Sequence, residues 1–173
     1  MKRYIIILIV LLSLASCTKH SEHWETLAQV ESYIEERPDS ALVVLQGIDN
    51  EELANDEERA KHALLLSMAL DKNYIDKTDF EVLQPAIDYY EDNGSAADKL
   101  RTYFYQGRIY QNAGNDALAM ECFVKAISEG DESDDILTKA RIYFNRGSIY
   151  YSLYEWDSFI ETNKTAASYF KQA

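Results

Sequence analysis

Few side chains in this sequence have the type and spacing that catalysis requires. Three histidines occur among the 173 residues. His20 and His23 stand three positions apart and could begin a metal site, but no third ligand is expected beside them, so we interpret them as part of a flexible tether. His62 falls in a predicted helix with no partner visible in the sequence. Glycine-rich phosphate loops, nucleophile elbows and paired-cysteine motifs are missing as well, so we predict a protein that is not an enzyme and binds no metal or cofactor.

Neighbouring carboxylates could suggest a glycosidase, which uses two acidic side chains. Such pairs occur at Glu35-Glu36, Glu51-Glu52, Glu57-Glu58 and Asp134-Asp135. They fall in predicted loops or at helix starts, where acids favour the helix dipole, so we interpret them as solvated or capping groups. With 30 Asp and Glu against 17 Lys and Arg, the net charge of −13 also opposes binding to nucleic acid.

The N-terminus has the layout of a secretory signal. Two positive charges in Met1 to Arg3 precede an apolar run from Tyr4 to Leu14, which is too short to span a bilayer. The sequence Leu14-Ala15-Ser16-Cys17 then resembles the lipobox of bacterial lipoproteins.

This resemblance implies that residues 1–16 are a signal peptide and that Cys17 receives palmitate-type acyl chains. The membrane is then a partner through this N-terminal lipid, and two or more acyl chains give lasting anchorage. Thr18 at the following position implies the outer membrane of a diderm bacterium, with the chain facing the periplasm or the cell surface. Lipidation of Cys17 leaves Cys122 alone, so we expect no internal disulfide.

The rest of the chain repeats with a period of forty residues. Residues 99–110 and 139–150 share seven identities in twelve positions. A weaker copy stands one period upstream, at Lys61, Ala63, Ser67, Leu70, Glu81 and Ala86. Self-similarity at such a period is typical of a stacked helical solenoid.

Each period predicts a helix, a turn and a second helix. Gly114 suits the end of the first helix and Asn115 or Asp116 can cap the second. Gly107 within a helix indicates that a facing helix approaches closely, with Ala119 as its small partner.

At this point the chain resembles the tetratricopeptide repeat family. The motif residues of the best copy are Tyr103, Gly107, Tyr110, Ala119, Phe123 and Ala126. The resemblance covers about residues 58–171 and implies an all-α fold in which helix-turn-helix units form an α-α superhelix. The period exceeds the family's 34 residues, so longer connections are expected at residues 91–95 and 130–135. Phe159 replaces the small residue of the family motif, which makes the packing of the last copy less regular.

We therefore predict four segments. Residues 1–16 form the signal peptide, 17–23 a lipidated tether, 24–57 an N-terminal helical pair or degenerate repeat, and 58–173 three repeats. The N-terminal pair is predicted to comprise helices over 24–36 and 41–48, with Asp39 or Ser40 capping the second. Because no polar helix closes the C-terminal end, we expect either a longer chain or a binding surface there.

The family resemblance implies that partners bind to the concave face formed by the first helix of each repeat. The candidate binding residues on that face are Lys61, Arg101, Phe104, Arg108, Gln111, Arg141, Phe144 and Tyr151. This basic and aromatic face on an acidic protein could attract a protein or peptide segment that carries acidic groups. The alternative is that these cations merely pair with acids one turn away in the same helices.

The leading hypothesis is a lipid-anchored scaffold for protein–protein contacts at the cell envelope. An alternative is the capture of a glycan or nutrient, for which Tyr151, Tyr154 and Trp156 could provide stacking surfaces. A second alternative is the sensory N-terminal part of a longer envelope signalling protein.

Overall fold

A computed structural model describes residues 22–173, in which helices are joined by turns and loops and no strand occurs. The predicted all-α class is therefore confirmed. The helices are α2 (Glu22–Tyr33), α3 (Pro38–Gln46), the short 3₁₀ helix η1 (Asn50–Glu52), α4 (Asp56–Lys72), α5 (Gln84–Asn93), α6 (Ala96–Asn112), α7 (Asp116–Glu129), α8 (Ile136–Ser152) and α9 (Trp156–Phe170). The predicted signal peptide, the lipidated Cys17 and His20 lie outside the described residues. Within residues 22–173, no helix combines the length and apolarity that crossing a membrane requires.

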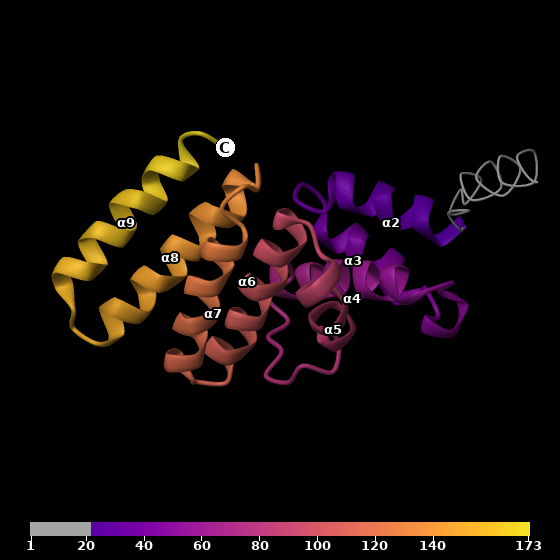
Figure 1. Ribbon diagram of the computed structural model, residues 1–173, viewed down its shortest axis with the longest axis horizontal. Coiled ribbons are helices and arrows are strands. Elements are labelled where there is room, and N and C mark those ends of the chain that lie inside the picture. The colour runs from indigo at the N-terminus through magenta and orange to yellow at the C-terminus, as the bar shows by residue number, and fades with distance from the viewer. Residues whose placement is uncertain (1–21) are drawn as a thin grey trace, which may run out of the picture.

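The helices pair as hairpins in chain order (Figure 1). The pairs are α2 with α3, α4 with α5, α6 with α7, and α8 with α9. The first helices of the last three pairs also contact one another, α4 with α6 and α6 with α8. These three helices therefore form one layer, which presents a common face.

The three C-terminal hairpins share one backbone feature at forty-residue intervals. The second residue after each first helix has a left-handed conformation, with φ of 59° at Tyr74, 76° at Gly114 and 62° at Tyr154. Each end is closed by a hydrogen bond from an amide to the carbonyl five residues earlier: Ile75 to Leu70, Asn115 to Tyr110 and Glu155 to Tyr150. This is the Schellman pattern of helix termination. The predicted forty-residue repeat is thus present in the backbone as well as in the sequence.

Gly107 allows α6 and α7 to approach each other closely, as predicted. A Cβ atom at Gly107 would lie 2.5 Å from Cε1 of Phe123 and 3.2 Å from the carbonyl oxygen of Ala119. The nearest neighbour is therefore the fully buried ring of Phe123, and Ala119 contributes its backbone. Asn115 caps α7 by accepting a hydrogen bond from the amide of Leu118, which confirms that prediction.

The first of these hairpins departs from the pattern. Ser67 stands one period before Gly107, and α5 begins only at Gln84, whereas α7 begins at Asp116. The segment 76–83, which corresponds to the first two turns of α7, is not an α-helix here. Leu83 nevertheless occupies the position of Phe123 and is fully buried. The hairpin thus keeps its apolar anchor while its second helix is shortened.

The N-terminal hairpin is joined to the others by apolar packing. Leu27, Val30 and Ile34 belong to the same buried core as the repeats. The predicted cap of α3 is wrong, since this helix begins at Pro38 after Arg37 and no side chain caps it. Proline suits the first position of a helix because its missing N–H would have no partner there.

Candidate binding groove

A groove is lined by side chains of α4, α6 and α8, of the turn between α2 and α3, and of the loop after α4. Its volume is about 580 Å³. The residues that line it are Glu35, Pro38, Asp71, Lys72, Tyr74, Asp76, Phe104, Tyr105, Arg108, Gln111, Arg141, Phe144, Asn145 and Ser148. The side chains come from all three first helices and from the turn after α2, so the groove depends on the stacking of the hairpins.

Five of the eight predicted binding residues line this groove, namely Phe104, Arg108, Gln111, Arg141 and Phe144. They differ in what they offer a partner. Phe104 is only 2% exposed and forms part of the floor, whereas Phe144 is 52% exposed. Phe144 and Tyr74, which is 91% exposed, are therefore the aromatic rings that the groove presents to a partner.

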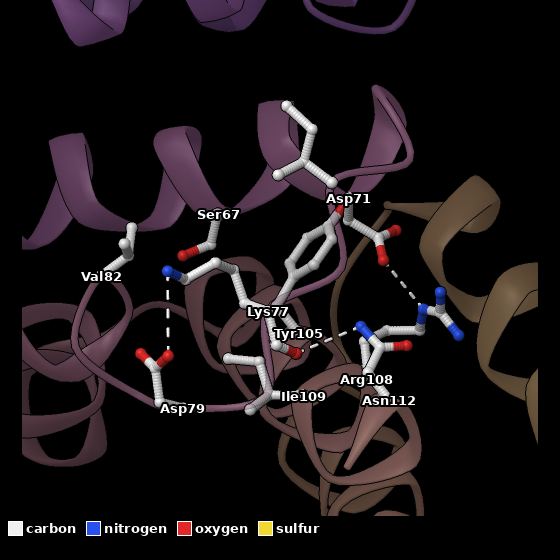
Figure 2. A pocket seen from close by; sticks show the side chains of 10 residues that line it. Ser67, Asp71, Lys77, Asp79, Val82, Tyr105, Arg108, Ile109 and Asn112 are labelled. Carbon is white, nitrogen blue, oxygen red and sulfur yellow. Dashed lines mark hydrogen bonds and ion pairs between the residues drawn. The ribbon is translucent and has the colours of Figure 1, made fainter. Parts of the chain in front are cut away.

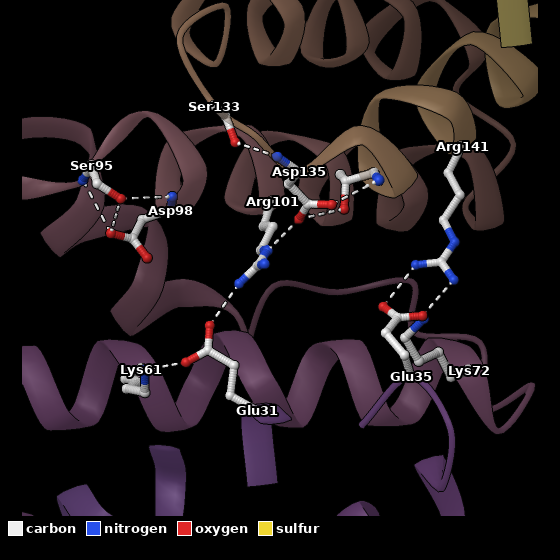
Figure 3. A network of polar contacts seen from close by, with 11 residues as sticks. Glu31, Glu35, Lys61, Lys72, Ser95, Asp98, Arg101, Ser133, Asp135 and Arg141 are labelled. Atoms are coloured by element: carbon white, nitrogen blue, oxygen red, sulfur yellow. Dashed lines mark hydrogen bonds and ion pairs between the residues drawn. The ribbon is translucent and has the colours of Figure 1, made fainter. Parts of the chain in front are cut away.

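Arg141 and Lys72 both bind the carboxylate of Glu35 (Figure 3). The Arg141 guanidinium donates two hydrogen bonds, of 2.9 Å to Oε1 and 2.6 Å to Oε2, and Lys72 Nζ lies 2.7 Å from Oε2. Two parallel hydrogen bonds of this kind give strong and directional recognition of a carboxylate. Glu35 thus joins the turn after α2 to α4 and α8.

Arg101 and Lys61 lie outside the groove and meet at a second acid of α2, Glu31 (Figure 3). Arg101 Nη1 lies 2.7 Å from Glu31 Oε1, and Arg101 Nε lies 2.5 Å from Oδ2 of Asp135, which caps α8. Lys61 pairs with the other oxygen of Glu31. The cations are thus paired, but with acids of other helices. The alternative of pairing within one helix is wrong for them.

These ion pairs lower the pKa of the acids involved. Burial would raise the pKa of Glu35 from its ordinary 4.5, but the hydrogen bonds from Arg141 and Lys72 outweigh it and lower the pKa to about 2. Burial also acts to raise the pKa of Glu31 and of Asp135. Their paired cations outweigh burial, so both pKa values are lowered. The three carboxylates therefore stay charged in any mildly acidic medium.

Arg108 organises the middle of the groove. Its Nε lies 3.0 Å from Asp71 Oδ1, and its Nη1 donates to the side-chain oxygens of Gln111 at 2.7 Å and Asn145 at 3.2 Å. The amide groups of Gln111 and Asn145 come from neighbouring helices and lie on the groove lining. Side-chain amides can both donate to and accept from a peptide backbone.

A small cavity lies next to the groove, beneath the loop between α4 and α5 (Figure 2). Its volume of about 20 Å³ is enough for one water molecule. Asp71 and Arg108 pair on its wall, and Lys77 and Asp79 pair at 3.8 Å. The buried hydroxyl of Ser67 has no hydrogen-bond partner among residues 22–173. The charged side chains named here are therefore paired with one another across the cavity wall.

The three aromatic residues of the glycan alternative lie together at the turn between α8 and α9. The Trp156 ring stands edge-to-face with Tyr151 at 5.5 Å and with Tyr154 at 5.8 Å between ring centroids. Tyr151 also contacts Phe159 at 5.4 Å. Tyr151, assigned above to the concave face, thus belongs to this aromatic cluster and does not line the groove.

The residues first considered for catalysis have structural contacts. His62 Nε2 lies 2.9 Å from the Leu45 carbonyl, and burial lowers its pKa, which favours the neutral ring. Glu58 accepts a hydrogen bond from the amide of Ala54, and Asp135 accepts one from the amide of Thr138, as their interpretation as capping groups predicts. Glu35 is not a capping or solvated group, because it joins helices through Arg141. Across residues 22–173, no three His, Cys, Asp or Glu side chains are grouped so as to hold a metal ion.

Sequence reasoning missed the groove residues Glu35, Lys72, Asp71 and Asn145. One signal could have found Glu35. Glu31 and Glu35 are four positions apart, and Lys61, Arg101 and Arg141 recur at forty-residue intervals, so an acidic pair could have been matched to a row of cations.

Comparisons with protein-family models, with curated proteins and with solved structures found no match. The fold and the groove define a protein of paired helices whose described part carries a polar and aromatic groove.

Proposed function

We propose that the protein is a lipid-anchored scaffold of the cell envelope that binds a segment of a partner protein in its groove. The helices would form a tetratricopeptide-like superhelix, and the lipobox-like Leu14 to Cys17 would supply the anchor. The observation that carries the proposal is the groove itself, in which the exposed ring of Phe144 lies beside the amide side chains of Gln111 and Asn145.

This lining suits an extended peptide better than a small substrate. Phe144 can pack against an apolar side chain, while Gln111 and Asn145 can bond the peptide backbone on either side. Five of the six charged groups that line the groove are held in ion pairs, and only Asp76 is outside them, so no pair of free groups is positioned for acid–base catalysis among the described residues. Recognition rather than catalysis is the use that these groups support.

The test is cross-linking in the native envelope followed by mass spectrometry. Phe144→Ala removes the exposed ring and should deplete the cross-linked partners of the wild-type protein. Val124→Ala is the matched control, because Val124 is similarly exposed but lies on α7 outside the groove lining. Identical partner profiles for the two variants, each with a wild-type melting temperature, would contradict the proposal.

The lipid anchor has its own test. Cys17→Ser should abolish metabolic labelling with palmitate and release the protein from the membrane fraction. Cys122→Ser is the control and should leave labelling intact. Labelling that survives Cys17→Ser would refute the lipoprotein assignment.

The aromatic cluster favours glycan binding as a second candidate function. Tyr151, Tyr154 and Trp156 are each about half exposed or more, and residues 147–163 contain no Lys, Arg or His. A surface that has acidic side chains and no cations would repel an anion, whereas it can accept hydrogen bonds from the hydroxyl groups of a neutral ligand. Trp156→Ala should then abolish binding on a glycan array, whereas Phe170→Ala should not. An array without wild-type signal excludes this candidate.

A further inference from the structure

We propose that Arg141 and Lys72 form a binding site for a partner's carboxylate, and that Glu35 of the same chain occupies this site until the partner replaces it. The proposal rests on the proposed use of the groove for partner binding and names the chemistry of that partner. Its test requires no partner, so the two can fail separately.

The geometry of the site is that of carboxylate recognition in general. Arg141 presents two N–H groups to the two oxygens of Glu35, and Lys72 adds a third donor to one of them. A planar guanidinium binds any carboxylate in this way, whether it belongs to the same chain or to another. Both cations line the groove, next to Phe144.

Glu35 is the most easily moved of the three residues. Its side chain is 39% exposed, against 26% for Arg141 and 11% for Lys72. It lies after the end of α2 at Tyr33, in the turn that leads to α3. Rotation of this side chain can therefore vacate the site while both cations stay in place.

Movement of the whole α2 helix is a far more costly way to vacate the site. Leu27, Val30 and Ile34 are almost fully buried and would become exposed to water. Glu31, which bridges Lys61 and Arg101, would lose its partners as well. Exchange at Glu35 alone is thus the step that a ligand can drive.

The charge balance of the groove indicates what the ligand carries. With Glu35 in place, three acids balance three bases; the acids are Glu35, Asp71 and Asp76, and the bases are Lys72, Arg108 and Arg141. Asp71 stays paired with Arg108. When Glu35 turns away, one positive charge remains uncompensated beside Phe144. The complementary ligand therefore has one carboxylate with an apolar or aromatic group next to it.

Occupation by Glu35 weakens the apparent affinity for such a ligand. A carboxylate on the same chain competes at a high effective concentration, and binding is reduced by the fraction of protein in which the site is filled. Removal of Glu35 should therefore improve ligand binding even though it lowers stability. A Glu35 with a purely structural role is not displaced, so it predicts that the wild type shows no saturable shift even at ligand concentrations far above those that rescue Glu35→Ala.

The experiment measures thermal unfolding of the full chain in the presence of 3-phenylpropanoate, a carboxylate with a nearby ring. Glu35→Ala should melt below the wild type, and 3-phenylpropanoate should restore its melting temperature in a saturable way. The ligand concentration that gives half of this rescue should be at least about tenfold lower than the concentration that first raises the melting temperature of the wild type. The neutral 3-phenylpropanamide should have no effect. The double variant Glu35→Ala/Arg141→Ala should not respond to the carboxylate.

Three results would overturn the proposal: no rescue of Glu35→Ala, equal rescue of the double variant, or a wild-type shift at the same ligand concentration. If Glu35→Ala does not fold, Glu35→Gln is titrated in the same way, since it keeps the side-chain volume and loses the charge. Rescue together with failed partner cross-linking would refute the proposed scaffold function alone.

Discussion

The hairpin α6–α7 and the hairpin α4–α5 occupy equivalent places in the repeat, yet they pack differently. In α6–α7, Gly107 lies against the Phe123 ring, and α7 begins at once after a three-residue turn. In α4–α5, Ser67 stands in the place of Gly107, the segment 76–83 is not an α-helix, and a small cavity adjoins Ser67. The same backbone turn can therefore be followed either by a second helix that packs at once or by one that begins two turns later.

The last hairpin is intermediate between them. Gly147 repeats Gly107, but its neighbour is the side-chain amide of Asn163 where α7 has Phe123. The approach is equally close, with the added Cβ 2.4 Å from Asn163 Nδ2, but the end of an amide side chain can rotate away whereas a buried ring cannot. The three hairpins thus share one backbone turn but differ at this position. A rigid buried ring faces Gly107 (the tight contact), a movable amide faces Gly147 (the loose contact), and α4–α5 (the open hairpin) has Ser67 there and lacks the start of its second helix.

The largest expected effect is at the tight contact. Gly107→Ala should lower the free energy of unfolding by about 1–3 kcal/mol, because the new Cβ atom would overlap the buried Phe123 ring. Gly147→Ala is the matched control and should change it by no more than about 0.5 kcal/mol, since Asn163 can move and alanine favours the helix. Urea unfolding measures both. Equal losses for the two variants would refute the contrast between tight and loose packing.

The next effect distinguishes the left-handed turns. Gly114→Ala should destabilise by about 1 kcal/mol through backbone strain alone, because no atom lies within 4 Å of the added Cβ. Tyr74→Gly at the equivalent position should stabilise by up to about 1 kcal/mol, since Tyr74 is 91% exposed and strained. Calorimetric melting temperatures should move in opposite directions. A loss of stability in Tyr74→Gly would show that the tyrosine ring has a contact of its own.

Acid should weaken the attachment of the N-terminal hairpin more than the tight contact of α6–α7. The pKa of Glu35 is about 2 in the folded protein and 4.5 ordinarily, so the unfolded chain takes up the proton first as pH falls. The stability that Glu35 contributes is present above pH 4.5 and is lost between about 4.5 and 2. Glu35→Gln should flatten this part of the urea-midpoint profile against pH. Parallel profiles for variant and wild type would contradict it.

The smallest effect is expected in the open hairpin. Ser67→Ala should leave stability unchanged or raise it by up to about 1 kcal/mol, because the buried Ser67 hydroxyl has no hydrogen-bond partner in the described part of the chain. Thr138→Val is a useful contrast, since the Thr138 hydroxyl donates to Asp135 at 2.9 Å and its loss should destabilise. If Ser67→Ala instead destabilises by more than about 1 kcal/mol, the hydroxyl has a partner after all.

Local signals in the sequence predicted the helical class and much of the hairpin geometry. Gly114, Asn115 and Gly107 were each interpreted correctly because caps, turns and close contacts depend on a few neighbouring residues. The late start of α5 was missed, since the forty-residue period places the start of that helix at residue 76, whereas it begins at Gln84 with Pro85 in its first turn. The cap of α3 was misassigned because Pro38 itself begins that helix.

The polar contacts of the groove were the least predictable part. Glu35 and Arg141 are 106 positions apart, and no local pattern joins them. The eight candidate residues came from family positions on one helix face. That reasoning could not show that Glu31 of α2 and Glu35 of the turn after it already pair with three of the candidate cations.

A double-mutant cycle on Glu35 and Arg141 tests the central claim most directly, namely that the turn after α2 reaches across the repeats and holds a cation of the groove. Urea unfolding of Glu35→Ala, Arg141→Ala and the double variant gives the coupling energy. We expect a favourable coupling of about 1 kcal/mol, since the two side chains share two hydrogen bonds. A coupling below about 0.3 kcal/mol would show that these residues act independently and would contradict the account.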